Sequence, residues 1–186
     1  MTGSAAAGPV PGLGLVLFLV ALAVQRTAEL VHSARNVARL RERGARSFGA
    51  AHFPLIVLVH VLFPACVVAE VLWLGARPGP AWPAWLGLVV AAQALRFATM
   101  RALGERWTVG IWVLPGEPLV RRGPYRLLPH PAYLAVVLEL LGAPMMFGAW
   151  RTAIGIGALD LVALRIRVGA EERALLGAGT TGPPDR

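Results

Sequence analysis

Five apolar stretches divide this chain, and they restrict it to a membrane protein built of helices. Each approaches the roughly 20 residues that a helix needs to cross the hydrocarbon core, and they run Gly12–Val31, His52–Leu74, Trp82–Met100, Tyr133–Trp150 and Thr152–Val168. Hydrophobic residues form 56% of the chain and its mean hydropathy is +0.63, too apolar for an ordinary soluble domain. We therefore expect residues 1–186 to form a single all-α membrane domain, a bundle of about five transmembrane helices.

The basic charge is all arginine, and its distribution predicts the orientation. Arginines fill the loops after the first and third apolar stretches and accompany the end of the fifth, whereas the alternate loops hold Arg77 and Arg151. By the positive-inside rule, the N-terminus lies outside and the C-terminus is cytosolic. The net charge of +8 alone would also suit a nucleic-acid partner, but this alternation favours a lipid bilayer, expected to be a bacterial cell membrane, and no nucleic acid.

The first apolar stretch is interpreted as a retained helix rather than a cleaved signal peptide. Ala21–Leu22–Ala23 resembles a cleavage site, but no positive charge precedes the stretch, and it continues to Glu29. Arg26 and Glu29 are three residues apart and share a helical face. We expect them to form an ion pair at the membrane interface.

Several classes of chemistry are disfavoured. Cys66 has no cysteine partner, and the four histidines are scattered with no pair at helical spacing, so no metal site is expected. A Gly-rich phosphate loop is missing, and no strand is predicted.

Glu70 lies near the outer end of the second stretch, where an interfacial position is expected.

The long connection Arg101–Ala132 carries the most informative motif. Its apolar part, from Trp107 to Leu114, suits the membrane interface. It ends in Gly-Pro-Tyr-Arg and then His-Pro-Ala-Tyr, with His130 held on non-helical backbone before Pro131, the expected first residue of a helix. The free N–H groups of that helix start suit a polar or anionic ligand.

A second polar group follows one helix later, in Arg165–Ile166–Arg167 and then Glu171–Glu172. Ionisable groups beside membrane helices are costly and mark function. Glu139 falls about two turns inside the fourth apolar stretch, so it is expected to pair with Arg96 or another helix, or to be protonated. Residues 177–186, rich in Gly, Thr and Pro, are expected to be a disordered tail.

Taken together, these motifs resemble the isoprenylcysteine carboxyl methyltransferase family of integral membrane enzymes. The resemblance is strongest over residues 107–176. Segments such as Gln25–Arg26, Ser33–Asn36 and Leu119–Gly123 are similar to a bacterial branch that O-methylates alkylpyrones or alkylresorcinols. The resemblance implies S-adenosylmethionine as cofactor and a lipophilic methyl acceptor, with no metal.

The resemblance also implies roles for individual residues. The cofactor contacts would be Gly123, Tyr125, His130, Pro131, Tyr133, Glu171 and Glu172. Arg167 would face the methyl-accepting oxygen, and Glu139 or His130 is a candidate base for a hydroxyl acceptor. Methyl transfer from a sulfonium depends mainly on in-line positioning and electrostatics.

The positions at which this sequence departs from the family pattern bear on the identity of the methyl acceptor more than on that of the cofactor. Eukaryotic members have His where Glu117 stands and Arg where Pro129 stands. An alkylated polyketide hydroxyl is therefore favoured over an isoprenylcysteine-type carboxylate. Two other functions stay open: an NADPH-dependent sterol-type membrane reductase, which shares the His-Pro-x-Tyr motif, and a non-enzymatic scaffold or transporter.

Overall fold

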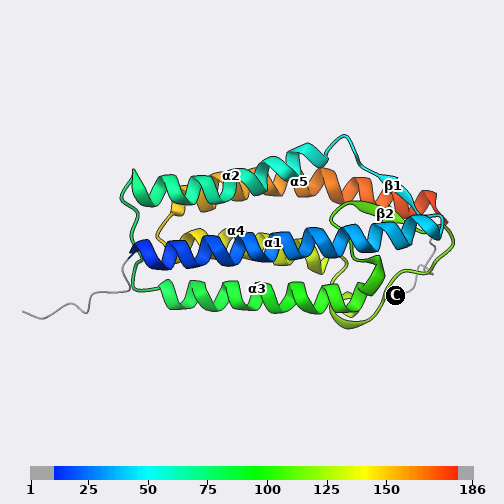
Figure 1. Ribbon diagram of the computed structural model, residues 1–186, viewed down its shortest axis with the longest axis horizontal. Coiled ribbons are helices and arrows are strands. Elements are labelled where there is room, and N and C mark those ends of the chain that lie inside the picture. Colours follow the sequence, from blue (N-terminus) through cyan, green and yellow to red (C-terminus); the bar gives the residue numbers. More distant parts are fainter. Residues whose placement is uncertain (1–10, 180–186) are drawn as a thin grey trace, which may run out of the picture.

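Five helices lie side by side in the computed structural model, which describes residues 11–179, and successive helices alternate in direction (Figure 1). Their bounds are α1 Pro11–Glu42, α2 Phe53–Leu72, α3 Trp82–Leu103, α4 Pro131–Met146 and α5 Trp150–Gly177. The all-α membrane bundle is thereby confirmed. Most of the expected C-terminal tail, from residue 180, lies outside the described residues.

Three of these helices are long and apolar enough to cross a membrane, namely α1, α2 and α3. The fourth helix has 16 residues, and at 1.5 Å per residue it is about 24 Å long, shorter than the roughly 30 Å hydrocarbon core. The fifth has 28 residues but carries charged groups along its length. Five crossings and an outside N-terminus remain predictions.

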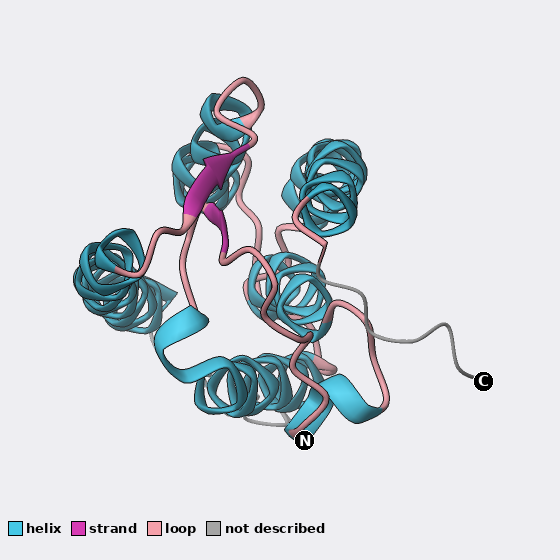
Figure 2. Cartoon of the chain, turned by 90° about the vertical axis from the view of Figure 1, so that its right-hand side faces the viewer, coloured by secondary structure: helices cyan, strands magenta, loops and turns pink. Residues whose placement is uncertain are grey.

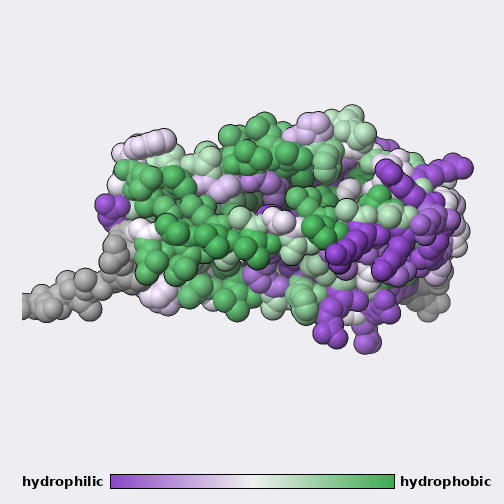
Figure 3. Space-filling model, viewed as in Figure 1, coloured by the Kyte–Doolittle hydropathy of each residue, from purple (hydrophilic) through white to green (hydrophobic). Residues whose placement is uncertain are grey.

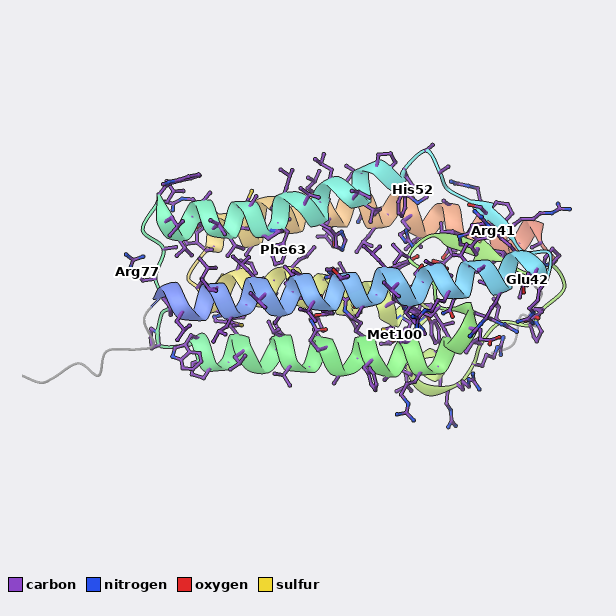
Figure 4. The ribbon with its side chains drawn as sticks, viewed as in Figure 1. Arg41, Glu42, His52, Phe63, Arg77 and Met100 are labelled. Carbon is purple, nitrogen blue, oxygen red and sulfur yellow. The ribbon has the colours of Figure 1, made fainter. Side chains whose placement is uncertain are left out.

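Polar and apolar surfaces are separated along the bundle. Figure 3 shows hydrophilic residues gathered at the end where α1, α3 and α5 finish, with an apolar surface along the remaining length. Arg41 and Glu42 lie at the polar end and Arg77 at the opposite end (Figure 4). Many large apolar side chains point outward, including Val20, Val61, Val90 and Ile154. An apolar belt with charge concentrated at one end suits a protein embedded in lipid.

The prediction that the chain contains no strand was wrong. β1, Arg46–Phe48, pairs antiparallel with β2, Ile111–Val113, and Ser47 lies opposite Trp112. Each strand has three residues, too few to show a period-2 pattern in the sequence. Figure 2 looks along the helices from the polar end and shows the strands crossing over it. The sheet joins the α1–α2 connection to the α3–α4 connection.

The apolar core lies between α1, α2, α4 and α5. Its buried members include Leu22 from α1, Phe63 from α2, Leu140 from α4 and Ile156 from α5. The ring of Phe18 packs near the rings of Phe63 and Phe147, with centroids 6.4 and 5.4 Å apart. Aromatic pairs at such separations contribute about 0.5–1.5 kcal/mol beyond their buried area.

A network of charged side chains lies inside the bundle and joins three helices. Glu139 of α4 accepts hydrogen bonds from Arg96 of α3 and, at 2.8 Å, from Arg26 of α1. Arg26 also bonds Glu29 at 2.8 Å. The expected Glu139–Arg96 pair is confirmed. The expected Arg26–Glu29 pair is also present and belongs to this network, and its position at the membrane interface stays a prediction.

Glu70, near the end of α2, is buried within the protein at 2% exposure, and its expected interfacial position stays a prediction. Its carboxylate accepts hydrogen bonds from the backbone N–H groups of Arg151, at 3.1 Å, and Thr152, at 2.7 Å, and from the Thr152 hydroxyl at 2.8 Å. These N–H groups belong to the first turn of α5, where a helix has no internal acceptors and favours negative charge. Glu70 thus caps α5 from the neighbouring helix α2.

The buried network predicts unequal effects of matched substitutions. Glu139→Leu leaves excess positive charge between α1 and α3 and should lower stability by about 3 kcal/mol or more. Adding Arg96→Met removes one charge of each sign and should recover part of that loss. Arg39→Met, which breaks an exposed pair with Glu105, should cost under about 1 kcal/mol. Thermal unfolding in detergent measures all four proteins, and equal losses from Glu139→Leu and Arg39→Met would contradict the role of the network.

The orientation can be tested by cysteine labelling in a Cys66→Ser background. Gly79→Cys lies in the connection between α2 and α3, and Leu127→Cys lies in the connection before α4, where Leu127 is 88% exposed. We expect a membrane-impermeant maleimide to label the first in intact cells and the second after permeabilisation. The reverse pattern would overturn the predicted orientation.

Candidate functional site

The polar end of the bundle contains a cavity of about 430 Å³. Its wall combines the first turn of α4, the last turns of α5 and the connection from α3 to α4. Six residues predicted for the site line it: Tyr125, His130, Tyr133, Arg167, Glu171 and Glu172. Apolar residues predicted to lie at the membrane interface also line it, among them Trp107, Ile111 and Leu114. The cavity therefore has one charged wall and one apolar wall.

Tyr133 stands at the centre of the charged wall. Its hydroxyl accepts a hydrogen bond from the Arg167 Nε at 2.9 Å and donates one to the Glu171 carboxylate. Arg167 is 8% exposed, and its second nitrogen bonds the Val109 carbonyl at 2.6 Å. Within residues 11–179, no ion pair within 4 Å links Arg167 to Glu171. The tyrosine hydroxyl instead connects the two side chains.

His130 lies beside this group as the residue preceding α4. Its ring stacks on the Tyr133 ring, with centroids 5.3 Å apart and planes inclined by 16°. Its two ring nitrogens lie 3.7 Å from a Glu171 oxygen and 3.5 Å from a Glu172 oxygen. The non-helical backbone at His130, with φ −131° and ψ 64°, and Pro131 at the helix start produce this position. The motif around His130 and the Glu171–Glu172 pair, far apart in sequence, thus meet.

The connection that covers the cavity is fastened to α1. The Asn36 side chain donates to the carbonyls of Trp107, at 2.7 Å, and Gly104, at 3.2 Å, and the Val109 N–H donates to the Ser33 hydroxyl at 2.9 Å. Reasoning from residue types did not assign Ser33 or Asn36 a place at the site. Their spacing of three residues, on the face of a helix that is otherwise apolar or basic, was the available signal.

Arg106 and Glu117 form a second fastening at the cavity mouth. Glu117 accepts hydrogen bonds from Arg106 and from Arg43 of the first connection. Arg106 also donates to the Pro118 carbonyl at 2.7 Å. The site prediction missed Arg106, which lines the cavity together with Glu117. Its charge contributes to the positive side of the cavity.

Two residues predicted as cofactor contacts, Gly123 and Pro131, do not line the cavity. They instead fix the backbone conformation of segments that form its wall. Gly123 opens a short 3₁₀ helix, Gly123–Arg126, with φ +58°. A Cβ built at Gly123 would lie 3.2 Å from the Ala102 Cβ. Gly123 thus lets this turn pack against α3 in a conformation that L-residues rarely adopt. Contact with a cofactor stays a prediction for both residues.

Glu139 is not brought to the cavity. It lies deeper in the bundle, 1% exposed and held by Arg26 and Arg96. Its two carboxylate oxygens accept hydrogen bonds from these guanidinium groups and do not face the cavity. The proposed catalytic role of Glu139 stays a prediction, and this geometry supports a positioning role.

A second hollow of about 420 Å³ runs between α4 and α5 and meets the first cavity. It shares three lining residues with that cavity, His130, Tyr133 and Glu172. Its remaining lining is mostly apolar, with Leu134 and Val137 from α4 and Leu161, Leu164 and Val168 from α5. An apolar groove therefore leads along the bundle to the polar side chains of the site.

Burial and charge alter two titratable groups near the site. Burial, and then the Glu171 carboxylate, raises the pKa of the Tyr125 phenol. Burial, and then the nearby Arg167 guanidinium, lowers the pKa of His52, which precedes α2. Both effects favour neutral side chains at physiological pH. The Tyr125 phenol therefore adds no negative charge to the cavity wall.

The donors and acceptors of the first cavity fit S-adenosylmethionine. Glu171 and Glu172 offer carboxylate oxygens to hydroxyl or ammonium donors, and Arg106 offers a guanidinium to a carboxylate. The apolar wall with Trp107 suits a flat base. A volume of about 430 Å³ lies within the range of about 300–1,000 Å³ that is typical of small-molecule sites.

The site thus combines a polar cavity with an adjoining apolar groove inside a helical membrane bundle. The model of the isoprenylcysteine carboxyl methyltransferase family matches residues 85–177, and the chain belongs to this family. It is thus an integral membrane methyltransferase by family. The matched region spans α4, α5 and the covering connection.

Two bacterial relatives match over most of their lengths. The chain is 35% identical over 159 residues to the uncharacterized protein YpbQ of Bacillus subtilis, covering 86% of this chain and 95% of the relative. It is 28% identical over 161 residues to an uncharacterized protein of Haemophilus influenzae, covering 86% and 93%. No solved structure matches.

The backbone role of Gly123 predicts a stability effect. Gly123→Ala should destabilise the protein by about 1–2 kcal/mol, because an L-residue is disfavoured at this φ and its Cβ meets Ala102. Gly155→Ala is the control, since Gly155 lies in α5 with no neighbour within 4 Å of an added Cβ. It should be neutral or stabilising by up to about 1 kcal/mol. Thermal unfolding in detergent distinguishes them, and equal midpoints would contradict the assignment.

Proposed function

We propose that the chain is an S-adenosylmethionine-dependent O-methyltransferase whose acceptor is a lipophilic molecule entering from the bilayer. The favoured acceptor is the hydroxyl group of an alkylated polyketide such as an alkylresorcinol or alkylpyrone. An isoprenylcysteine-type carboxylate is the other acceptor that the family suggests. The observation that carries the proposal is the meeting of a polar cavity and an apolar groove at His130, Tyr133 and Glu172.

The residues of the polar cavity are suited to hold the cofactor. When bound, S-adenosylmethionine supplies a methyl group on a positively charged sulfur. Glu171 and Glu172 can accept hydrogen bonds from its hydroxyl or ammonium groups, and their charge attracts the cation. Arg106 can bind its carboxylate, and the apolar wall around Trp107 excludes water.

The groove residues are suited to place the acceptor. Leu134, Leu161 and Leu164 offer apolar surface to an alkyl chain, so the polar head of the acceptor reaches the end of the groove at Tyr133. Arg167 lies there with its guanidinium 5.4 Å from the centre of the Tyr133 ring. Its positive charge favours an oxygen that carries negative charge. Catalysis then rests on approach and electrostatics.

Cofactor binding gives the primary test. S-adenosylhomocysteine at 100 times its Kd should stabilise the parent protein by about 2.7 kcal/mol. His130→Ala and Glu172→Gln should bind it at least about tenfold more weakly, because each removes a polar group from the cavity wall. Thermal shifts in detergent over a concentration series give the constants. Glu105→Gln, an exposed carboxylate outside the cavity, is the matched control and should bind like the parent.

The same assay separates the other functions. Stabilisation by NADPH and not by S-adenosylhomocysteine would overturn the proposal in favour of a reductase. Stabilisation by neither would support a scaffold or transporter. With S-adenosylmethionine present, mass spectrometry of an alkylresorcinol and a prenylcysteine analogue identifies the acceptor. Methylation of the prenylcysteine analogue alone would contradict the polyketide preference.

A further inference from the structure

Tyr133 occupies an unusual place, because its side chain carries a hydroxyl and the residue lines both the polar cavity and the apolar groove. It is therefore available both to a group in the cavity and to a group arriving along the groove. The same hydroxyl is held from two sides by α5, through Arg167 and Glu171. These contacts fix its orientation.

The hydrogen-bonding capacity of this hydroxyl is partly used. A tyrosine hydroxyl has one donor hydrogen and can accept two hydrogen bonds. The hydrogen is donated to Glu171, and one acceptor position takes the Arg167 Nε–H at 2.9 Å. The second acceptor position can take an O–H group from a bound molecule. A hydroxyl acceptor placed there would have a hydrogen-bonded path from its own proton, through Tyr133, to a carboxylate.

We propose that Tyr133 and Glu171 form a proton relay that serves a neutral hydroxyl acceptor, an inference that rests on the proposed function. The acceptor proton passes to the Tyr133 oxygen while the Tyr133 proton passes to Glu171. The acceptor oxygen forms its bond to the methyl carbon as the methyl–sulfur bond breaks, with sulfur keeping the electron pair. A hydroxyl, a sulfonium cation and a carboxylate become an ether, a thioether and a carboxylic acid, so atoms and charge balance.

Arg167 supports this relay without taking a proton. Its guanidinium stays charged, and its hydrogen bond to the Tyr133 oxygen favours negative charge there while the two protons move. The relay also explains why α5 offers two adjacent glutamates. Glu172 can still accept a hydrogen bond from the cofactor when Glu171 takes the proton. The titratable and charged groups that line the cavity and groove with Tyr133 are Tyr125, Arg106, Glu117 and Arg121 from the covering connection, His130 at the start of α4, and Arg165, Arg167, Glu171 and Glu172 from α5.

The relay distinguishes between acceptor classes. A phenol with a pKa near 10 is ionised to about one part in a thousand at pH 7, so its methylation needs a base. General base catalysis contributes about 10²–10⁴-fold. A carboxylate acceptor is already ionised and needs none. Loss of the relay should therefore affect the two acceptor classes unequally.

The first experiment compares Tyr133→Phe with the parent on both acceptors at saturating S-adenosylmethionine. At pH 7 the variant should lose about 100-fold or more in turnover of an alkylresorcinol, and this loss should exceed its loss on a prenylcysteine analogue at least tenfold. Turnover of the alkylresorcinol by the variant should rise about tenfold per pH unit up to the acceptor pKa, more steeply than in the parent. Equal losses on the two acceptors, or parallel pH profiles, would overturn the relay.

A second measurement needs no cofactor. An alkylated nitrophenol, whose ionised form absorbs at longer wavelength, is bound to the parent, to Tyr133→Phe and to Glu171→Gln, and titrated. The Tyr133 hydroxyl can donate to the phenolate, so Tyr133→Phe should raise the apparent pKa of the bound nitrophenol by about one unit, whereas Glu171→Gln removes a nearby negative charge and should lower it. Unchanged titration in both variants would overturn the relay. Should Tyr133→Phe not fold, Glu171→Gln decides.

The proposed function and the relay can fail separately. A parent that does not bind S-adenosylhomocysteine would contradict the proposed function, whereas the nitrophenol titration still reports on the relay. A parent that binds it and methylates both acceptors, with Tyr133→Phe showing equal losses, would retain the function and reject the relay.

Discussion

The structure depends on one constraint: a charge inside an apolar bundle requires a partner of opposite charge. Removal of water from an ion is so costly that an unpaired group is not tolerated, and here the pairs join helices that are distant in sequence. Glu139 of α4 lies between Arg26 of α1 and Arg96 of α3. Most of the surface of α1 is apolar and exposed, so its packing against other helices is limited. The charged network therefore gives α1 a defined depth and rotation, and α1 in turn holds the connection over the cavity through Ser33 and Asn36.

Much of the fold and part of the site could be predicted from the sequence. Segment length and hydropathy identify all five helices, since they are local properties, but the apolar stretches end well before α1 and α5 do, because those helices continue through polar residues to Glu42 and Gly177. The motif around His130 and the Glu171–Glu172 pair could be placed together through the family resemblance, and six of the predicted residues line one cavity. The relation that could not be predicted is the long-range pairing. Nothing near Arg26 indicates Glu139, which lies 113 positions away, and the three-residue strands carry no detectable pattern.

The residues of the site come from segments that are held in place in different ways. Arg167, Glu171 and Glu172 share one continuous helix, α5, so their spacing is set by helical geometry. Tyr133 and His130 lie at the start of α4, where Pro131 fixes the backbone. The covering connection has short strands and turns that are held by side-chain bonds to α1. Chemistry that needs accurate placement is thus carried by helices, whereas the apolar wall of the cavity belongs to the connection.

The cap that Glu70 provides at the start of α5 also affects how α5 is oriented at the opposite end of the bundle. A helix is stiff to twisting, and successive residues turn by about 100°. The backbone N–H groups of Arg151 and Thr152 donate hydrogen bonds to Glu70. These bonds fix the rotation of α5 about its own axis at its first turn. Glu171 lies 19 residues after Thr152, about 28 Å along the same rod. A small rotation at the capped end would turn Arg167 and Glu171 away from Tyr133, so a buried carboxylate at the far end of the bundle keeps the residues of the site aligned.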